Sequence, residues 1–386
     1  MSSSDYLLFT TGPVMIPERI RAVLNLPMIS HRDPEFLKIY AKVIEGLKHF
    51  SGTGGYVIPL SASGTGGMEA AILNCTSAGD RVLVVDQGKF SSRWVAMCRI
   101  LGLDVKEMKL SLRASIDSAQ FADLLKHEAG IKAVVIVHCE TSTGAINDIE
   151  RLADVIRRNS DAIFIVDAIS TFGVLPINMD GWGIDVVVFT SNKGLMNPPG
   201  VAFVALNDRA FSIAREVKRS YYFDFSHTQD SYKLGKGSPF TPAIPIFRGV
   251  ACAVDIINEI GFEQFKQQHK SLANAFRTTI RSLDLKLWPE NPSDSVTVIE
   301  MPAEIDAARV CADLKANFHL VLSKGQGDLV GKVIRVGHYG IIDLNSYNYL
   351  LSSLVENLVG YGYAKKVSDV ISIFKTYSAS IGSSCQ

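Results

Sequence analysis

Between residues 56 and 206 the chain alternates short, apolar, β-branched runs with longer segments of helical pattern. Near-continuous Val, Ile and Leu runs separated by helices are typical of a parallel sheet that is covered on both faces. The pattern therefore predicts a doubly wound α/β layer in the first six tenths of the chain. We expect strands at GYVIPLS, RVLVVDQ, AVVIVHCE, AIFIVDAIS, DVVVFTS and VAFVAL, with helices at GGMEAAILNCT and SRWVAMCRILG among others.

The pattern changes after TPAIPIFRGV (241–250). A long helical segment over 251–283, which we expect to break near Gly261, precedes SVTVIEMP, DAARVCADLKANF, VIRVGHYG and SYNYLLSSLVENLVGYG. Strand, helix, strand and helix in this order predict a compact α+β domain. We therefore expect an N-terminal segment over 1–17, a large α/β domain over 18–255, a small C-terminal domain over 256–365 and a tail over 366–386.

Composition and charge narrow the class of protein. The 39 Lys and Arg residues equal the 39 Asp and Glu residues, so no net field attracts nucleic acid or an anionic membrane, and we expect neither as a partner. No apolar stretch is long enough to span a bilayer, and the first residues do not resemble a secretory signal. The six cysteines are scattered, which argues against a disulfide framework and a metal site and favours a cytoplasmic setting.

One lysine, Lys193, follows an apolar strand in VVVFTSNKGLMNPPGVAFVAL. An ammonium in such surroundings is costly unless it is paired or neutralised. Asp167 ends another apolar strand, at the sheet edge where ligands of open α/β sheets bind. The two side chains make either a salt bridge at the sheet edge or the two functional groups of a cofactor site.

A third feature favours the cofactor site. SASGTGGMEAA follows a strand and opens a helix at about Gly67, so Ser63, Gly64 and Thr65 can cradle a phosphate with backbone N–H groups. Glycines before a helix are also common turn residues, and the stretch alone does not decide. A lysine for an aldehyde, an acid for a pyridine nitrogen and amides for a phosphate are together what pyridoxal phosphate needs. Phe90, just after a strand, offers an apolar face to a planar ring, although it also fits a plain core position.

From about residue 8 to 360 the chain resembles the class V pyridoxal-phosphate aminotransferases of the alanine/serine–glyoxylate or –pyruvate kind. The resemblance lies in several motifs in one order: GPVMIPERI, SHRDPEF, SGTGGMEAA, HCETSTG, VDAISTFG, SNKGLMNPPGVAFV, TPAIP and VIRVGHYG. It implies the fold type I of aspartate aminotransferase, with a large, mixed, mostly parallel sheet domain and a smaller C-terminal α+β domain. It also implies a homodimer with active sites at the interface.

The resemblance implies a role for each motif residue. Lys193 would form the Schiff base, and Asp167 would pair with the pyridine nitrogen. Phe90 would stack on the ring where many relatives have tryptophan, and Asn192 replaces the glutamine most relatives carry before the lysine. The remaining assignments are Ser63, Gly64 and Thr65 to the phosphate, Thr141 to the cofactor 3-hydroxyl, Thr241 to the phosphate of the neighbouring subunit, and Arg335 to the substrate carboxylate.

Two alternatives remain. The 2-aminoethylphosphonate–pyruvate aminotransferases are favoured by HCETSTG, VDAISTFG and Asn192. The alanine/serine–glyoxylate branch is favoured by SHRDPEF, TPAIP and RVGHYG. A cysteine desulfurase-like lyase needs a mobile cysteine in the small domain. LSKGQGDLVGK contains none, and Cys311 lies in a helical pattern. We therefore expect a transaminase that moves an amino group from alanine or serine to glyoxylate or pyruvate.

Overall fold

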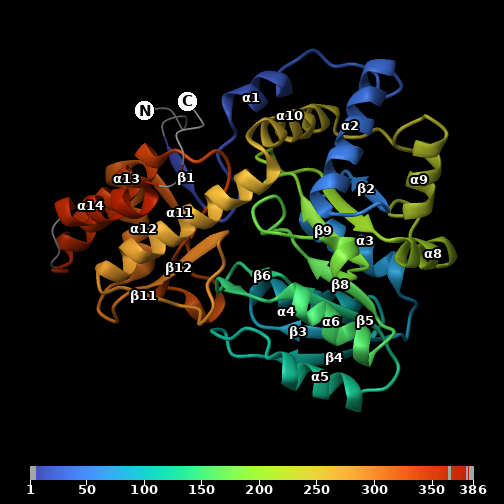
Figure 1. The fold of residues 1–386 in the computed structure, drawn as a ribbon, viewed down its shortest axis with the longest axis horizontal. Helices are drawn as coiled ribbons and strands as arrows, with labels where there is room; N and C mark the ends of the chain where they lie inside the picture. The colour runs from blue at the N-terminus through green and yellow to red at the C-terminus, as the bar shows by residue number, and fades with distance from the viewer. Residues whose placement is uncertain (1–5, 364–366, 380, 382–386) are drawn as a thin grey trace.

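A seven-stranded sheet forms the centre of the large domain in the computed structural model, which describes residues 6–363, 367–379 and 381 (Figure 1). Five of its strands pair in parallel with one another, and the strand Ala202–Leu206 (β10) is antiparallel to both strands beside it. All six predicted strands are present, and the α/β prediction is confirmed. The seven strands of this sheet follow the order β2 (Tyr56–Leu60), β10 (Ala202–Leu206), β9 (Val186–Thr190), β8 (Ile163–Asp167), β5 (Ile131–Val137), β3 (Arg81–Asp86) and β4 (Asp104–Lys109).

Helices cover both faces of this sheet, as its apolar strands require. One face packs against α2 (Pro34–Ser51), α5 (Ser118–His127), α6 (Ile149–Asn159) and α10 (Ile244–Ile260), and the other against α3 (Gly64–Cys75), α4 (Lys89–Ile100) and α8 (Asp208–Glu216). Strand β9 shows the division, because Val187 and Phe189 belong to the first core and Val186 and Val188 to the second. The remaining helices of this part are α1 (Glu18–Leu24), α7 (Met179–Trp182) and α9 (Phe225–Lys233).

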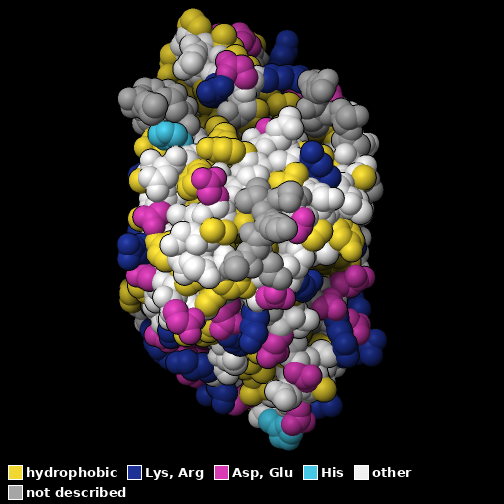
Figure 2. Space-filling view, turned by 90° about the vertical axis from the view of Figure 1, so that its left-hand side faces the viewer, with side chains coloured by type: hydrophobic (Ala, Val, Ile, Leu, Met, Phe, Trp, Pro, Cys, Tyr) yellow, Lys and Arg dark blue, Asp and Glu magenta, His cyan; other side chains and the backbone are white. Residues whose placement is uncertain are grey.

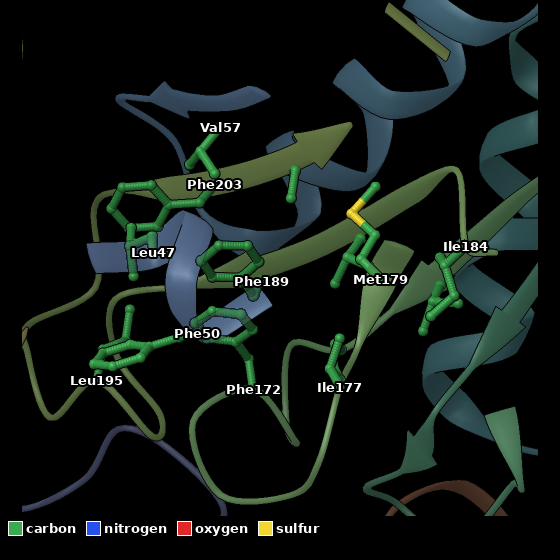
Figure 3. Close-up of a cluster of buried hydrophobic side chains, with 14 of the residues drawn as sticks. Leu47, Phe50, Val57, Phe172, Ile177, Met179, Ile184, Phe189, Leu195 and Phe203 are labelled. Atoms are coloured by element: carbon green, nitrogen blue, oxygen red, sulfur yellow. The ribbon is translucent and has the colours of Figure 1, made fainter. Parts of the chain in front are cut away.

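Three aromatic rings fix the strands on either side of Lys193. Phe172, Phe189 and Phe203 stack in sequence, with ring centroids 3.6 Å and 5.4 Å apart (Figure 3). Contacts between aromatic rings add to the stabilisation that the burial of each ring gives. Leu195, two residues after the lysine, packs in the same cluster. The turn that carries Lys193 is therefore held on a rigid base.

A second sheet lies beside the first and has five strands, in the order β1 (Leu7–Phe9), β13 (Leu320–Lys324), β14 (Val333–Gly337), β12 (Val296–Glu300) and β11 (Lys286–Leu287). β1 from the N-terminal segment pairs parallel with β13, so the chain start completes the small sheet. The small sheet shares its core with four helices, α11 (Phe262–Ser282), α12 (Ala307–Phe318), α13 (Leu344–Gly360) and α14 (Val367–Ser378). A 3₁₀ turn lies at Gly327–Leu329. A short hairpin of β6 (Cys139–Glu140) and β7 (Ala145–Ile146) follows β5.

Two expected boundaries differ in the structure. The break near Gly261 is present, with a φ of 90°, but the expected boundary at 255 falls inside α10. We therefore place the division between the domains at Gly261. The expected tail over 366–386 is wrong for 367–378, because these residues form α14 and bury Val370 and Phe374 in the small-domain core. Residues 366, 380 and 382–386 of the expected tail lie outside the described residues.

The surface agrees with the balanced charge of the sequence. On the face that Figure 2 presents, basic and acidic side chains are interspersed. Among the helices of the described ranges, none combines the length and apolar character needed to cross a bilayer.

Candidate active site

A cavity of about 150 Å³ gathers most of the predicted residues at the carboxyl ends of the large-sheet strands. Ligands of open α/β sheets bind at this edge. The predicted residues that line it are Ser63, Gly64, Thr65, Phe90, Thr141, Asp167, Asn192 and Lys193. Five separate stretches of chain therefore converge on this cavity.

The first turn of α3 forms one wall. The helix begins at Gly64, three residues earlier than expected, and the Ser63 side chain caps it by accepting from Gly66 N at 3.4 Å. Helix geometry leaves the Gly64 and Thr65 N–H groups without a hydrogen-bond acceptor among the described residues. A Cβ on Gly64 would lie 2.8 Å from the end of the Ile169 side chain, so a larger residue there would require Ile169 to shift. Free N–H groups at a helix start suit an anion.

Asp167 ends β8 and is 4% exposed. Its Oδ2 accepts from the Trp94 indole N–H at 2.9 Å, and its Oδ1 accepts from Ile169 N at 3.0 Å. Burial raises the pKa of this carboxyl to about 6, although both hydrogen bonds favour the ionised form. Among the described residues no ion pair includes Asp167, so the salt bridge considered from the sequence is not formed. A buried carboxylate in this state suits a cationic partner such as a pyridinium N–H.

Lys193 lies in the turn after β9, partly buried. Its Nζ donates to the Thr11 carbonyl of the N-terminal segment. Burial lowers the pKa of the amine to about 8, and the positive charge of Arg335 acts in the same direction. Gly12, with a φ of 113°, packs so closely that an added Cβ would lie 2.5 Å from Lys193 Cε. The amine is therefore held in place, and it gives up its proton more readily than an exposed lysine does.

Helix α4 contributes three side chains to the site. Phe90 and Arg93 line the cavity, and Trp94 is the donor to Asp167. The sequence predictions included only Phe90. Their spacing in the sequence could have indicated Arg93 and Trp94, because residues three and four positions after Phe90 share its face of the helix.

A buried carboxylate, Glu140, fixes the start of α4. It accepts from Phe90 N at 3.1 Å and Ser91 N at 2.9 Å, and also from Ser142 N at 3.1 Å. The N–H groups of Phe90 and Ser91 are free groups of the α4 N-terminus, where a negative charge is favoured. Glu140 thus positions the helix that carries the three site residues. It was not predicted, although it lies within the HCETSTG motif.

Arg335 reaches the site from the small domain. It lies on β14, is 4% exposed, and donates from Nε to Lys324 O and from Nη1 to Thr141 O, each at 3.0 Å. Burial lowers its pKa, but an arginine with a usual pKa above 12 stays charged. Its Nη2 makes no hydrogen bond within the described part of the chain. Thr141 lines the cavity, so the guanidinium of Arg335 contacts a residue of the cavity wall.

Thr241 does not join this group. It is exposed and borders a separate depression with Ser61, Tyr222 and Phe240. Within one subunit the structure therefore does not bring it to the cavity.

The described cysteines are all buried. Cys139 lines the cavity, but burial raises its pKa to about 11, which disfavours the reactive thiolate. Cys311, in α12, is also buried, and the 3₁₀ turn of the small domain carries no cysteine. The arrangement that a desulfurase requires is thus not present among the described residues.

Comparisons with known proteins agree with the geometry. The model of the "Aminotransferase class-V" family matches residues 22–328. The chain is 33% identical to the "Soluble hydrogenase, small subunit" of Synechococcus sp. (strain PCC 6716), over 92% of this chain and 94% of that protein. It is 32% identical to the serine–glyoxylate aminotransferase of Hyphomicrobium methylovorum, over 87% and 85% of the two chains. A solved structure, the ureidoglycine–glyoxylate aminotransferase of Bacillus subtilis, superposes with a TM-score of 0.90 at 25% identity, covering 97% and 98% of the chains.

Proposed function

The chain belongs to the class V aminotransferase family, and we propose that this pyridoxal-phosphate-dependent transaminase moves an amino group from alanine or serine to glyoxylate or pyruvate. The observation that carries the proposal is the convergence of Lys193, Asp167 and the first turn of α3 on one cavity. The two named aminotransferases above differ in their amino donors but share glyoxylate as acceptor, which supports a small 2-oxo acid as acceptor here.

The residues present fit the cofactor. When bound, pyridoxal phosphate supplies an aldehyde that takes up the amino group and a ring that accepts electrons from the substrate Cα. The Lys193 amine holds the aldehyde and moves the proton at the substrate Cα. Asp167 holds the proton on the ring nitrogen, oriented by Trp94 and Ile169. The cofactor phosphate would bind to Ser63, Gly64 and Thr65, and the cofactor ring would stack on Phe90. The 3-hydroxyl would contact Thr141, and Asn192 would also contact the cofactor.

A half-reaction screen tests the function. The cofactor-loaded protein is mixed separately with alanine, serine, aspartate, cysteine and 2-aminoethylphosphonate, and the visible absorbance is followed. We expect alanine or serine to convert the cofactor to its amino form and glyoxylate or pyruvate to restore it. Conversion by 2-aminoethylphosphonate alone would favour that branch instead. Release of sulfide from cysteine would indicate the desulfurase-like lyase.

Arg335 is proposed to anchor the substrate carboxylate. A guanidinium and a carboxylate in a desolvated cleft form a directional pair, and breaking one costs about 2–5 kcal/mol. Arg335→Ala should therefore lower kcat/KM for carboxylate substrates by roughly 30-fold to several thousand-fold. Arg335→Lys should keep the cofactor colour and still weaken both half-reactions, because an ammonium cannot replace the planar fork.

A matched control is Arg113→Lys. Arg113 also joins the two domains, through Trp288 O at 2.8 Å and Glu300 at 2.7 Å, but it does not line the cavity. Its replacement should leave kcat/KM within about threefold of the wild type. If Arg335→Ala changes kcat/KM by less than that for every carboxylate substrate, the anchor lies elsewhere.

A homodimer with shared sites is proposed from Thr241. This exposed residue adjoins Tyr222 and Phe240, which stack 5.1 Å apart, and Tyr221 nearby is 79% exposed. Exposed aromatic side chains are enriched at protein interfaces. The assignment of Thr241 to the partner's phosphate site explains why it lies away from the cavity of its own subunit.

Subunit mixing tests the shared site. Lys193→Ala and Thr241→Glu subunits are each expected to be inactive as homodimers, the second because its carboxylate repels the phosphate. Unfolded and refolded together, they should regain about one quarter of wild-type activity, since half of randomly paired dimers are hybrids with one intact site each. An active monomer in sedimentation, or mixing without recovery, would contradict shared sites.

We also propose a cytoplasmic setting. Five of the six cysteines lie in the described residues, and all five are buried and unpaired. Cys385 lies outside them. Unpaired cysteines without a disulfide framework suit a reducing compartment.

A further inference from the structure

Neither the sequence predictions nor the family membership assigned a role to Arg93, which lies at the cavity. Its Nη1 donates to the Thr65 hydroxyl at 2.8 Å, and its guanidinium carbon lies 5.2 Å from the centroid of the Phe90 ring. All three side chains line the cavity. The arginine therefore joins the helix start proposed for the phosphate to the ring proposed for stacking.

Within the part of the chain that the structure describes, the charge of Arg93 has no acidic partner. No ion pair between Arg93 and an Asp or Glu occurs in the described part of the chain. Arg99, on the same helix, shows the usual alternative, because it is exposed and pairs with Glu107 at 2.8 Å. An unpaired guanidinium that is partly withdrawn from water and held by a neutral hydroxyl is available to an anion.

A phosphate at the start of α3 needs such a charge. A phosphate monoester carries a charge of about −1.5 to −2 at neutral pH, whereas a helix N-terminus supplies only about +0.5. Of the side chains that line the cavity in the described residues, Lys193 and Arg93 carry the positive charges. Lys193 is used by the aldehyde, so Arg93 remains for the phosphate.

We propose that Arg93 binds the cofactor phosphate, with its guanidinium and the Thr65 hydroxyl acting on the same group of oxygens. Arg93 then makes the site selective for the phosphorylated cofactor over pyridoxal. This inference rests on the proposed function, because it takes pyridoxal phosphate as the ligand of the cavity.

The test compares two ligands that differ only in the phosphate. Dissociation constants of pyridoxal phosphate and of pyridoxal are measured on the cofactor-free protein by quenching of tryptophan fluorescence. We expect Arg93→Gln to weaken binding of pyridoxal phosphate by about 10- to 100-fold, the usual loss for a charge-assisted hydrogen bond. Pyridoxal binding should change by less than about threefold, which also shows that the variant is folded.

Two further variants sharpen the result. Arg93→Lys keeps the charge and should recover part of the affinity for pyridoxal phosphate. Arg99→Gln makes the same substitution six residues along α4 and should change neither dissociation constant. Inorganic phosphate should compete with pyridoxal phosphate on the wild type, and this competition should be at least about tenfold weaker in Arg93→Gln.

The outcomes separate the two proposals. Equal losses for both ligands in Arg93→Gln mean that the arginine is structural, and unchanged binding of pyridoxal phosphate means that it does not touch the phosphate. Either result overturns the assignment and leaves the proposed function standing. A wild-type protein that binds neither ligand overturns the proposed function and the assignment together.

Discussion

Lys193→Ala protein should transfer no measurable amino group, with kcat at least about 10⁴-fold below that of the wild type. The change removes the amine that holds the cofactor aldehyde and the group that moves the substrate Cα proton. The first turn of α3 and Asp167 remain, so the cofactor should still bind without a covalent link. After borohydride treatment, peptide mass spectrometry should find the cofactor on Lys193 of the wild type and no adduct on the variant.

The control for this variant is Lys109→Ala, at the exposed end of the edge strand β4. Loss of that lysine should change neither the adduct nor the rate of transfer. A reduced adduct on a lysine other than Lys193, or a Lys193→Ala protein within tenfold of wild-type turnover, would refute the assignment.

The pH dependence of covalent attachment tests the same lysine in a second way. Burial lowers the pKa of Lys193 to about 8, so the amine loses its charge at a lower pH than an exposed lysine, whose pKa is about 10.4. Only the neutral amine attacks an aldehyde. The attachment rate should therefore fall about tenfold per pH unit below pH 8 and level off above it. A rate that keeps rising to pH 10 would show that an exposed lysine reacts instead.

The large sheet could be predicted because most of its strands are buried on both faces. Such strands read as continuous apolar runs, and β8 and β9 are examples in which every residue is buried. The edge strand β4, with the sequence DVKEMK, was missed because it exposes charged side chains and carries no such run. Edge strands commonly hold charges that prevent unwanted pairing.

The C-terminal helix α14 was missed for a different reason. Its inward residues Val370 and Phe374 have the i, i+4 spacing of an amphipathic helix, so the signal is present in the sequence. The Ser-rich residues that follow led to the interpretation of the whole segment as a tail. The helix is recognisable mainly through its packing on α11 and α13.

The contacts between motifs could not be predicted from the sequence. Trp94 reaches Asp167 across 73 positions, and that contact depends on how α4 docks on the sheet. Glu140 sets this docking through N–H groups that no side-chain pattern reveals. Strand ends and motif residues were therefore predictable, whereas the side chains that orient them required the tertiary structure.

Asp167→Asn should lower kcat by about 10²- to 10³-fold, the range seen when a group that stabilises transition-state charge is removed. An amide cannot hold the proton on the ring nitrogen, so the ring accepts electrons from the substrate Cα less readily. The amide also meets two donors, Trp94 Nε1–H and Ile169 N–H, with only one oxygen. One donor then faces the amide NH₂ group, which should lower the free energy of unfolding by about 1–3 kcal/mol.

A loss of stability alone must be separated from a loss of chemistry, and Asp185→Asn provides the comparison. Asp185 immediately precedes β9, at the end of the strand away from the cavity, and is 4% exposed. It accepts from Phe164 N at 2.8 Å and from Arg209 at 2.7 Å. Its amide variant should lose a similar 1–3 kcal/mol, about what an unsatisfied buried donor costs, yet keep wild-type kcat per folded molecule. Both variants are measured by chemical denaturation and by turnover below their transitions. If Asp167→Asn falls in stability as Asp185→Asn does but keeps its turnover, the strand-end acid is structural, and the ring nitrogen is held by another group.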